Sequence, residues 1–188
     1  MIHNSIVESP FSLNILNGNL IGGKVIEAKK CLNDLVGFFD DESKRSEMKQ
    51  DELIYEVLSL LPVKENTEGG LFFGRTIIHP GKVGDEYYMT KGHFHSNSNR
   101  AEYYWGLEGE GMLILMNRDR NTWAERIFPG SLHYIPGHVA HRTANISNIR
   151  LIIGACWPSD AGHDYDEIQN KGFSSRLMEV NGKPQLIG

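Results

Sequence analysis

The chain has 188 residues, 40% of them apolar and 23% charged, which is the balance of a single folded domain. Its formal net charge of -5 and the lack of a Lys/Arg stripe exclude nucleic acid as an expected partner. No apolar run approaches the roughly 20 residues of a membrane-spanning helix. The N-terminal residues also lack the basic region and apolar run of a signal peptide. We therefore expect a cytoplasmic protein with no membrane partner.

The N-terminal quarter differs in pattern from the rest of the chain. Asn17–Gly18 and Gly22–Gly23 predict loops with a strand or two between them. From Val25 to about Glu47, apolar residues recur at helix-like spacing with Lys and Asp on the other side, which predicts a peripheral amphipathic helix. We expect residues 1–50, strands and helix together, to pack on the outside of the domain.

Beyond Asp51, short apolar runs alternate with turns rich in Gly, Pro, Asn or Asp. Many short strands separated by turns at this spacing indicate an antiparallel barrel or a jelly-roll sandwich. No repeat or linker divides the chain, so we expect one domain over residues 1–188, with the barrel core at about 51–160 and a C-terminal segment that covers the barrel. The predicted strands are Leu53–Leu61, Leu71–Ile78, Glu86–Thr90, Glu102–Leu107, Gly111–Met116, Thr122–Phe128, Ser131–Ile135 and Leu151–Cys156.

Two histidines separated by one residue, His93 and His95, suggest a metal site. Alternate residues of a strand point to the same face, so both imidazoles can reach one ion. Glu102 begins the next predicted strand, and a hairpin over residues 96–101 would return its carboxylate to the pair. A His-x-His pair alone more often binds no metal, so the prediction depends on further ligands.

A further histidine comes from residues 136–141, a turn-rich segment close to a strand end that offers both His138 and His141. Three imidazoles and one carboxylate suit Fe²⁺, Mn²⁺, Ni²⁺ or Zn²⁺ better than Mg²⁺ or Ca²⁺. On a metal that accepts six ligands, such a set leaves two positions for substrate oxygens.

The order of these residues resembles the two motifs of the cupin superfamily. The first motif covers His93, His95, Glu102 and Gly109, and the second runs from Gly130 through Pro136 and His141 to Asn145. Only His141 aligns with the motif histidine, and His138 occupies a place where the motif usually has Gly. The resemblance implies an all-β cupin (jelly-roll) β-barrel with a small helical N-terminal decoration. The implied metal ligands are His93, His95, Glu102 and His141.

Longer segments closely resemble the cupin-type phosphoglucose isomerases, the archaeal-type glucose-6-phosphate isomerase family. They are residues 80–84, 88–95, 100–102, 140–145 and 158–165. The likeness extends from about Phe11 to about Leu177. It implies a metal-dependent aldose–ketose isomerase that interconverts glucose 6-phosphate and fructose 6-phosphate. It also implies a homodimer with one divalent transition metal per subunit, Fe²⁺ before Mn²⁺, Ni²⁺ or Zn²⁺, and no nucleotide cofactor.

The family also implies roles for individual residues. Glu102 is the candidate proton carrier between C1 and C2, with a metal-assisted hydride shift as the alternative, and His163 is the candidate for ring opening. Thr76, Thr90 and the backbone N–H of Gly92 would donate to the phosphate. At the phosphate end this chain has Trp157 where the family usually has Tyr. The remaining residues expected to line the sugar site are Tyr55, Tyr104 and Tyr165.

Two other classes of function stay open on the sequence. One is a different metal-dependent cupin, such as a dioxygenase or another sugar isomerase or epimerase, which would use the same ligands on a substrate without phosphate. The other is a non-catalytic sugar-binding cupin, which needs neither the full ligand set nor a carboxylate placed for proton transfer.

Overall fold

Antiparallel strands make up most of the structure, a computed structural model that describes residues 6–188. No helix in this range is long and apolar enough to cross a membrane. The helical elements are a 3₁₀-helix, η1 (Leu32–Leu35), and two α-helices, α1 (Glu42–Glu47) and α2 (Asp166–Lys171). The strands are β1 (Ser12–Leu13), β2 (Leu20–Ile21), β3 (Val25–Cys31), β4 (Leu53–Leu60), β5 (Leu71–Ile78), β6 (Lys82–Val83), β7 (Glu86–Tyr87), β8 (Glu102–Glu108), β9 (Gly111–Met116), β10 (Thr122–Ile127), β11 (Leu132–Ile135), β12 (Ala140–Asn145), β13 (Leu151–Pro158), β14 (Arg176–Val180) and β15 (Lys183–Ile187).

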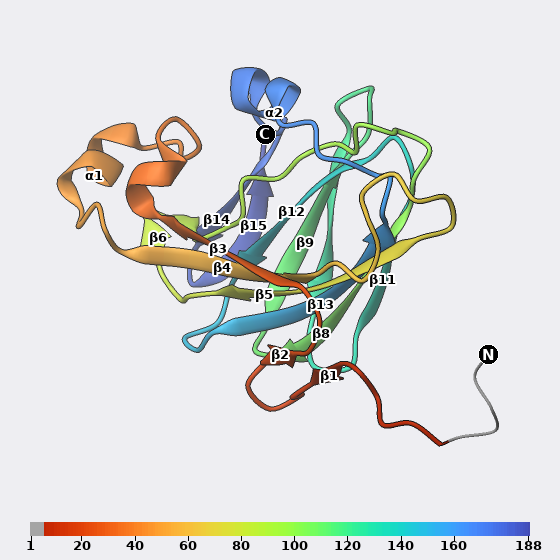
Figure 1. The fold of residues 1–188 in the computed structure, drawn as a ribbon. Coiled ribbons are helices and arrows are strands. Elements are labelled where there is room, and N and C mark those ends of the chain that lie inside the picture. Colours follow the sequence, from red (N-terminus) through yellow and green to blue (C-terminus); the bar gives the residue numbers. More distant parts are fainter. Residues whose placement is uncertain (1–5) are drawn as a thin grey trace.

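The larger sheet has the strand order β11-β8-β13-β5-β4-β3. β5 and β13 lie inside this sheet and pair along their full lengths, from Leu71↔Pro158 to Ile78↔Leu151. Apolar runs of this kind are typical of strands with neighbours on both sides. Figure 1 shows this sheet curving beneath β9 and β12.

A three-stranded sheet, β10-β9-β12, faces the larger one, and the short strands β6, β7, β14 and β15 form a further sheet at one end of the barrel. Met89 forms an isolated antiparallel bridge with Ala144 of β12, so the chain at Met89 lies beside this strand. The core contains Ile78 and Ile153 of the large sheet together with Leu113 and Leu115 of β9, all buried. The arrangement confirms the predicted all-β jelly-roll barrel.

The helix predicted over Val25–Glu47 is wrong. Residues Val25–Cys31 form β3, which pairs with β4 from Val25↔Leu60 onward, and only η1 and the short α1 are helical. The backbone hydrogen bonds of the exposed sheet edge outweigh the weak helical spacing of the apolar residues. The N-terminal decoration is therefore a strand followed by two short helical turns.

The sequence prediction also missed strands. All six residues of β12 are buried, and the strand carries little apolar character, so it shows neither alternation nor an apolar run. β14 and β15 were not predicted, and β7 ends at Tyr87 rather than at Thr90. The missed β12 is important because it carries His141.

Candidate metal centre

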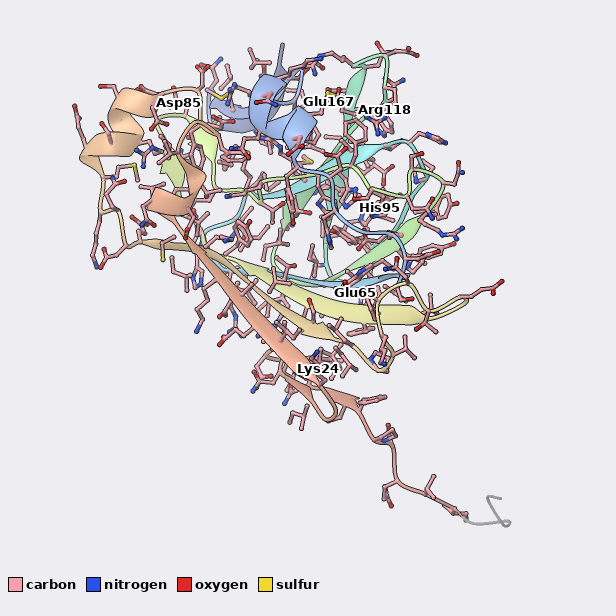
Figure 2. The ribbon with its side chains drawn as sticks, turned by 45° about the horizontal axis from the view of Figure 1, so that its top comes forward. Lys24, Glu65, Asp85, His95, Arg118 and Glu167 are labelled. Carbon is pink, nitrogen blue, oxygen red and sulfur yellow. The ribbon has the colours of Figure 1, made fainter. Side chains whose placement is uncertain are left out.

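Four side chains converge inside the barrel. One ligand atom from each of His93, His95, Glu102 and His141 lies within 4.8 Å of the others. Glu102 begins β8, and His141 is the second residue of β12. Figure 2 shows His95 within the body of the barrel. The exposed His138 lies outside the cluster, where its Nε2 is 2.9 Å from Oδ1 of Asn99.

The histidine pair is held differently from the predicted strand hairpin. His93 forms an isolated antiparallel bridge with His141, through N–H to carbonyl distances of 3.2 and 3.1 Å. Phe94 forms a second bridge with Asp164, so residues 93–95 are extended without belonging to a named strand. The loop over residues 96–101 still returns Glu102 to the pair. Backbone pairing thus sets the distance between two candidate ligands directly.

Hydrogen bonding orients His95 toward the centre of the cluster. Its Nδ1 lies 2.8 Å from the carbonyl oxygen of Arg100, which can only accept, so Nδ1 carries the proton. In neutral His95 the unprotonated Nε2 then faces Oε2 of Glu102 at 3.1 Å, which brings two electron-pair acceptors together. This contact requires either a second proton on His95 or a cation between the two atoms.

The other two imidazoles bring buried nitrogens without partners. Among residues 6–188, Nε2 of His93 and both ring nitrogens of His141 are buried and make no hydrogen bond. Nε2 of His141 lies 3.2 Å from Oε2 of Glu102 but outside hydrogen-bonding geometry. Unpaired buried polar atoms are costly, and a cation bound at this point would satisfy them together. The donor set therefore fits a divalent transition metal.

The protonation states of His93 and Glu102 agree with a metal site. Burial, reinforced by His141, His163 and His95, holds the pKa of His93 well below its usual value, so its imidazole is neutral. Burial alone would raise the pKa of Glu102, but the interactions with His141 and His95 outweigh it and lower that pKa. Neutral imidazole and ionised carboxylate are the forms that bind metals.

A cavity of about 260 Å³ opens above the cluster and collects the other predicted residues. Tyr104 follows Glu102 by two residues on β8 and so points to the same side of the sheet. His163 lies beside His93, with ring centroids 4.4 Å apart, and stacks on Tyr165 at 5.9 Å. The predicted residues that line this cavity are Tyr55, Thr76, Thr90, Gly92, His93, Glu102, Tyr104, His141, Trp157, His163 and Tyr165.

The lining of the cavity also combines hydroxyl groups with positive charge. Oγ1 of Thr90 accepts the N–H of Thr143 at 3.1 Å, so its own hydrogen stays free to donate. Lys30 and Lys91 also line the cavity, and neither was predicted. Burial, followed by the charge of Lys30, lowers the pKa of Lys91. Lys91 stands inside the motif that ends at His95 and could have been noticed there, whereas Lys30 lies in the segment wrongly predicted to be helical.

A jelly-roll barrel with three imidazoles and one carboxylate at the floor of an open cavity defines a cupin with a candidate metal site. A family model described as Glucose-6-phosphate isomerase (GPI) matches residues 29–185, most of the chain. The chain belongs to the glucose-6-phosphate isomerase family, as its motifs predicted.

Curated relatives agree with the family model along nearly the full length. The chain is 40% identical over 182 residues to a glucose-6-phosphate isomerase of Thermococcus kodakarensis, covering 95% of this chain and 94% of the relative. It is 38% identical over 184 residues to that of Pyrococcus furiosus, covering 96% and 95%. Among solved structures it is similar to a deletion mutant of Bacillus subtilis oxalate decarboxylase, with a TM-score of 0.45, 17% identity, and coverage of 58% of this chain and 27% of the other.

Proposed function

We propose that this chain interconverts glucose 6-phosphate and fructose 6-phosphate in the cavity above His93, His95, Glu102 and His141. One divalent transition metal is held by those side chains, Fe²⁺ before Mn²⁺, Ni²⁺ or Zn²⁺, and no nucleotide cofactor takes part. The observation that carries the proposal is a single cavity lined both by three of the four residues of the ligand cluster and by hydroxyl and ammonium groups. A sugar phosphate has matching chemistry at its two ends.

Glu102 is the proposed proton carrier. When bound, the metal supplies positive charge that polarises the carbonyl and stabilises negative charge on the neighbouring oxygens. Both short contacts of Glu102 to imidazoles involve Oε2, and Oε1 takes part in neither. Oε1 is therefore the atom placed to take a proton from one sugar carbon and return it to the next.

His163 is the proposed group for ring opening. Burial lowers the pKa of His163, so the resting ring is neutral at pH 7. Its unprotonated nitrogen can take the proton of the sugar's C1 hydroxyl, and the imidazolium so formed can return a proton to the ring oxygen as the bond between C1 and that oxygen breaks. Stacking on Tyr165 restrains the orientation of the imidazole. Burial also holds the pKa of Tyr104 well above its usual value, so this phenol remains a hydrogen-bond donor beside the cluster.

The phosphate is proposed to lie at the end formed by Thr76, Thr90 and the backbone N–H of Gly92. The left-handed backbone of Gly92, with φ of 77°, is one that glycine adopts without strain. Trp157 can offer one indole N–H to the phosphate, where a tyrosine could both donate and accept. Tyr55 of β4 also lines the cavity.

A coupled assay with fructose 6-phosphate tests the proposal. Protein stripped of metal by a chelator should be inactive and should regain activity with Fe²⁺ or Mn²⁺. His141→Ala should lose bound metal and lower kcat/KM by about 100-fold or more, because a first ligand is removed. His138→Ala is the matched control and should keep both metal and activity. Activity that is indifferent to metal would contradict the proposed mechanism.

The same assay separates the other two functions. A sugar-binding cupin would bind the sugar phosphate without turnover at any metal content. A dioxygenase, or an isomerase or epimerase of unphosphorylated sugars, would recover metal without gaining activity on fructose 6-phosphate.

The cellular setting is also part of the proposal. We propose a cytoplasmic homodimer in which residues 1–188 form one domain. The unpaired thiols of Cys31 and Cys156 agree with a reducing compartment.

A further inference from the structure

A second cavity, of about 240 Å³, lies on the other side of β12 from the metal cluster. Neighbouring residues of a strand point to opposite faces, so Arg142 faces this cavity while His141 faces the first. The other walls are residues 37–38 after η1, the last turn of α2 and the start of β14. Figure 1 shows α2 at the end of the barrel beside the C-terminus. The two cavities share no lining residue.

The lining of the second cavity is rich in positive charge. Arg142, Lys171 and Arg176 line it, and none of the lining residues carries a carboxylate. This composition distinguishes it from the first cavity, which contains Glu102.

Arg142 is the most unusual of the three cations because it is buried and forms no direct ion pair with any residue of the described range 6–188. Its residue is 3% exposed, and within residues 6–188 its Nε makes no hydrogen bond. Nη1 donates to Sδ of Met89 at 2.9 Å, a weak acceptor, and the guanidinium carbon lies 4.0 Å from the ring centroid of Phe173. A buried charge with so few partners is costly unless an anion joins it.

The nearby acidic groups are engaged elsewhere. Both oxygens of Glu86 lie 3.1 Å from Nη1 of Arg176, and Oε2 also accepts the backbone N–H of Asp40 at 2.8 Å. The Asp40 carboxylate lies 3.5 Å from Nε of Arg176. Glu86 also attracts Arg142 electrostatically, but its direct contacts go to Arg176 and Asp40, so the Nε of Arg142 is left without a partner among residues 6–188.

The C-terminal carbonyls of α2 would repel an anion, but another residue already binds them. Nη2 of Arg120 donates to the carbonyls of Lys171 and Gly172 at 3.3 and 3.2 Å. This contact offsets the negative end of the short helix.

We propose that the second cavity is a binding site for a phosphate group, either inorganic phosphate or the phosphate of a small ester. A guanidinium and an ammonium supply directed donors to a tetrahedral anion, and the cavity has room for it. The site lies directly behind the first cavity. A Cβ built on Gly92 would lie 2.9 Å from both Cβ of Arg142 and a ring carbon of Phe173. An anion that fixes Arg142 and Phe173 therefore also restrains the segment that carries His93.

Isothermal titration calorimetry with inorganic phosphate and the metal-loaded protein tests this site. Lys171→Gln changes an exposed side chain and should weaken phosphate binding by about threefold to tenfold. Arg142→Gln should abolish it, with circular dichroism to verify the fold. Lys183→Gln is the control, because it removes the same charge from another exposed position. Lys30→Gln reports on phosphate bound in the first cavity and should leave the second site unchanged.

The outcomes are distinct. Tighter binding of inorganic phosphate than of methyl phosphate supports a site for the free ion, and the reverse order supports a site for an ester. Phosphate binding that depends on Lys30 but not on Lys171 or Arg142 would place the anion in the first cavity and overturn the proposal. Binding of acetate in place of phosphate would overturn it as well.

Discussion

The two oxygens of the Glu102 carboxylate have different surroundings. Oε2 faces His95 and His141, whereas Oε1 is free of both contacts, which suits one oxygen to the metal and the other to the substrate proton. With Glu102 as proton carrier, turnover in D₂O should place deuterium in the product, because a carboxylic acid exchanges its proton with solvent. Glu102→Gln should lower kcat by about 10²- to 10⁴-fold.

Mass spectrometry or NMR of the product decides this point. Complete retention of the substrate hydrogen at every extent of conversion would favour the hydride shift instead. Glu108→Gln, on the same strand but paired with Arg150 at 3.1 Å, is the matched variant and should leave the deuterium content unchanged.

The metal cluster could be predicted from the sequence because residue type and order alone are informative there. His93, His95, Glu102 and His141 match a motif, and the structure brings them together. Lys30 could not be found in the same way. It reaches the cavity only because residues 25–31 form an edge strand, and this follows from pairing with β4 rather than from local spacing.

The loop over residues 96–101 connects two parts of the site and is fixed at Arg100. Its carbonyl orients His95, and its guanidinium holds Asp160 through distances of 2.8 and 2.6 Å. This ion pair holds the pKa of Asp160 below its usual value. Asp160→Asn should loosen the loop and weaken metal affinity by about tenfold, as is typical when support behind a ligand is lost.

Competition with a chelator of known affinity measures this effect. Glu110→Gln is the control, since Glu110 makes a comparable pair with Arg126 at 2.7 Å and neither residue lines the cavity above the cluster. Equal metal affinity in the two variants would show that the Arg100–Asp160 pair does not support His95.

The strands differ in how far their sequence determines them. β5 and β9 have the predicted bounds, because each is a compact apolar run between turns. β12 is buried on both faces although most of its residues are polar. His141 on one face belongs to the metal cluster, and Arg142 on the other face lines the second cavity. The burial of this strand depends on tertiary contacts that local pattern does not reveal, so strands that build sites are the hardest to predict.

The assembly of the whole molecule can be argued from its exposed apolar surface. β11 is an edge strand of the large sheet, and Leu132 and Tyr134 on it are 66% and 54% exposed. Tyr134 pairs with Tyr103 of β8, itself 47% exposed, and their ring centroids lie 5.3 Å apart. An apolar patch beside an unpaired strand edge is typical of a surface between subunits. We therefore place the interface of the predicted homodimer here.

Light scattering should accordingly give a mass about twice the 21.2 kDa of one chain. Leu132→Glu should shift the mass toward that of a single chain, because a charge would be buried without a partner at the centre of the patch. Val36→Glu adds the same charge at an exposed residue that follows η1 and lies outside the large sheet, so it should leave the dimer intact. A mass near 21.2 kDa for the unaltered protein would refute the dimer, and a dimer that resists Leu132→Glu would move the interface to another surface.

Both cavities lie within one chain, so a monomeric variant that retains isomerase activity would further show that the site is complete without a partner.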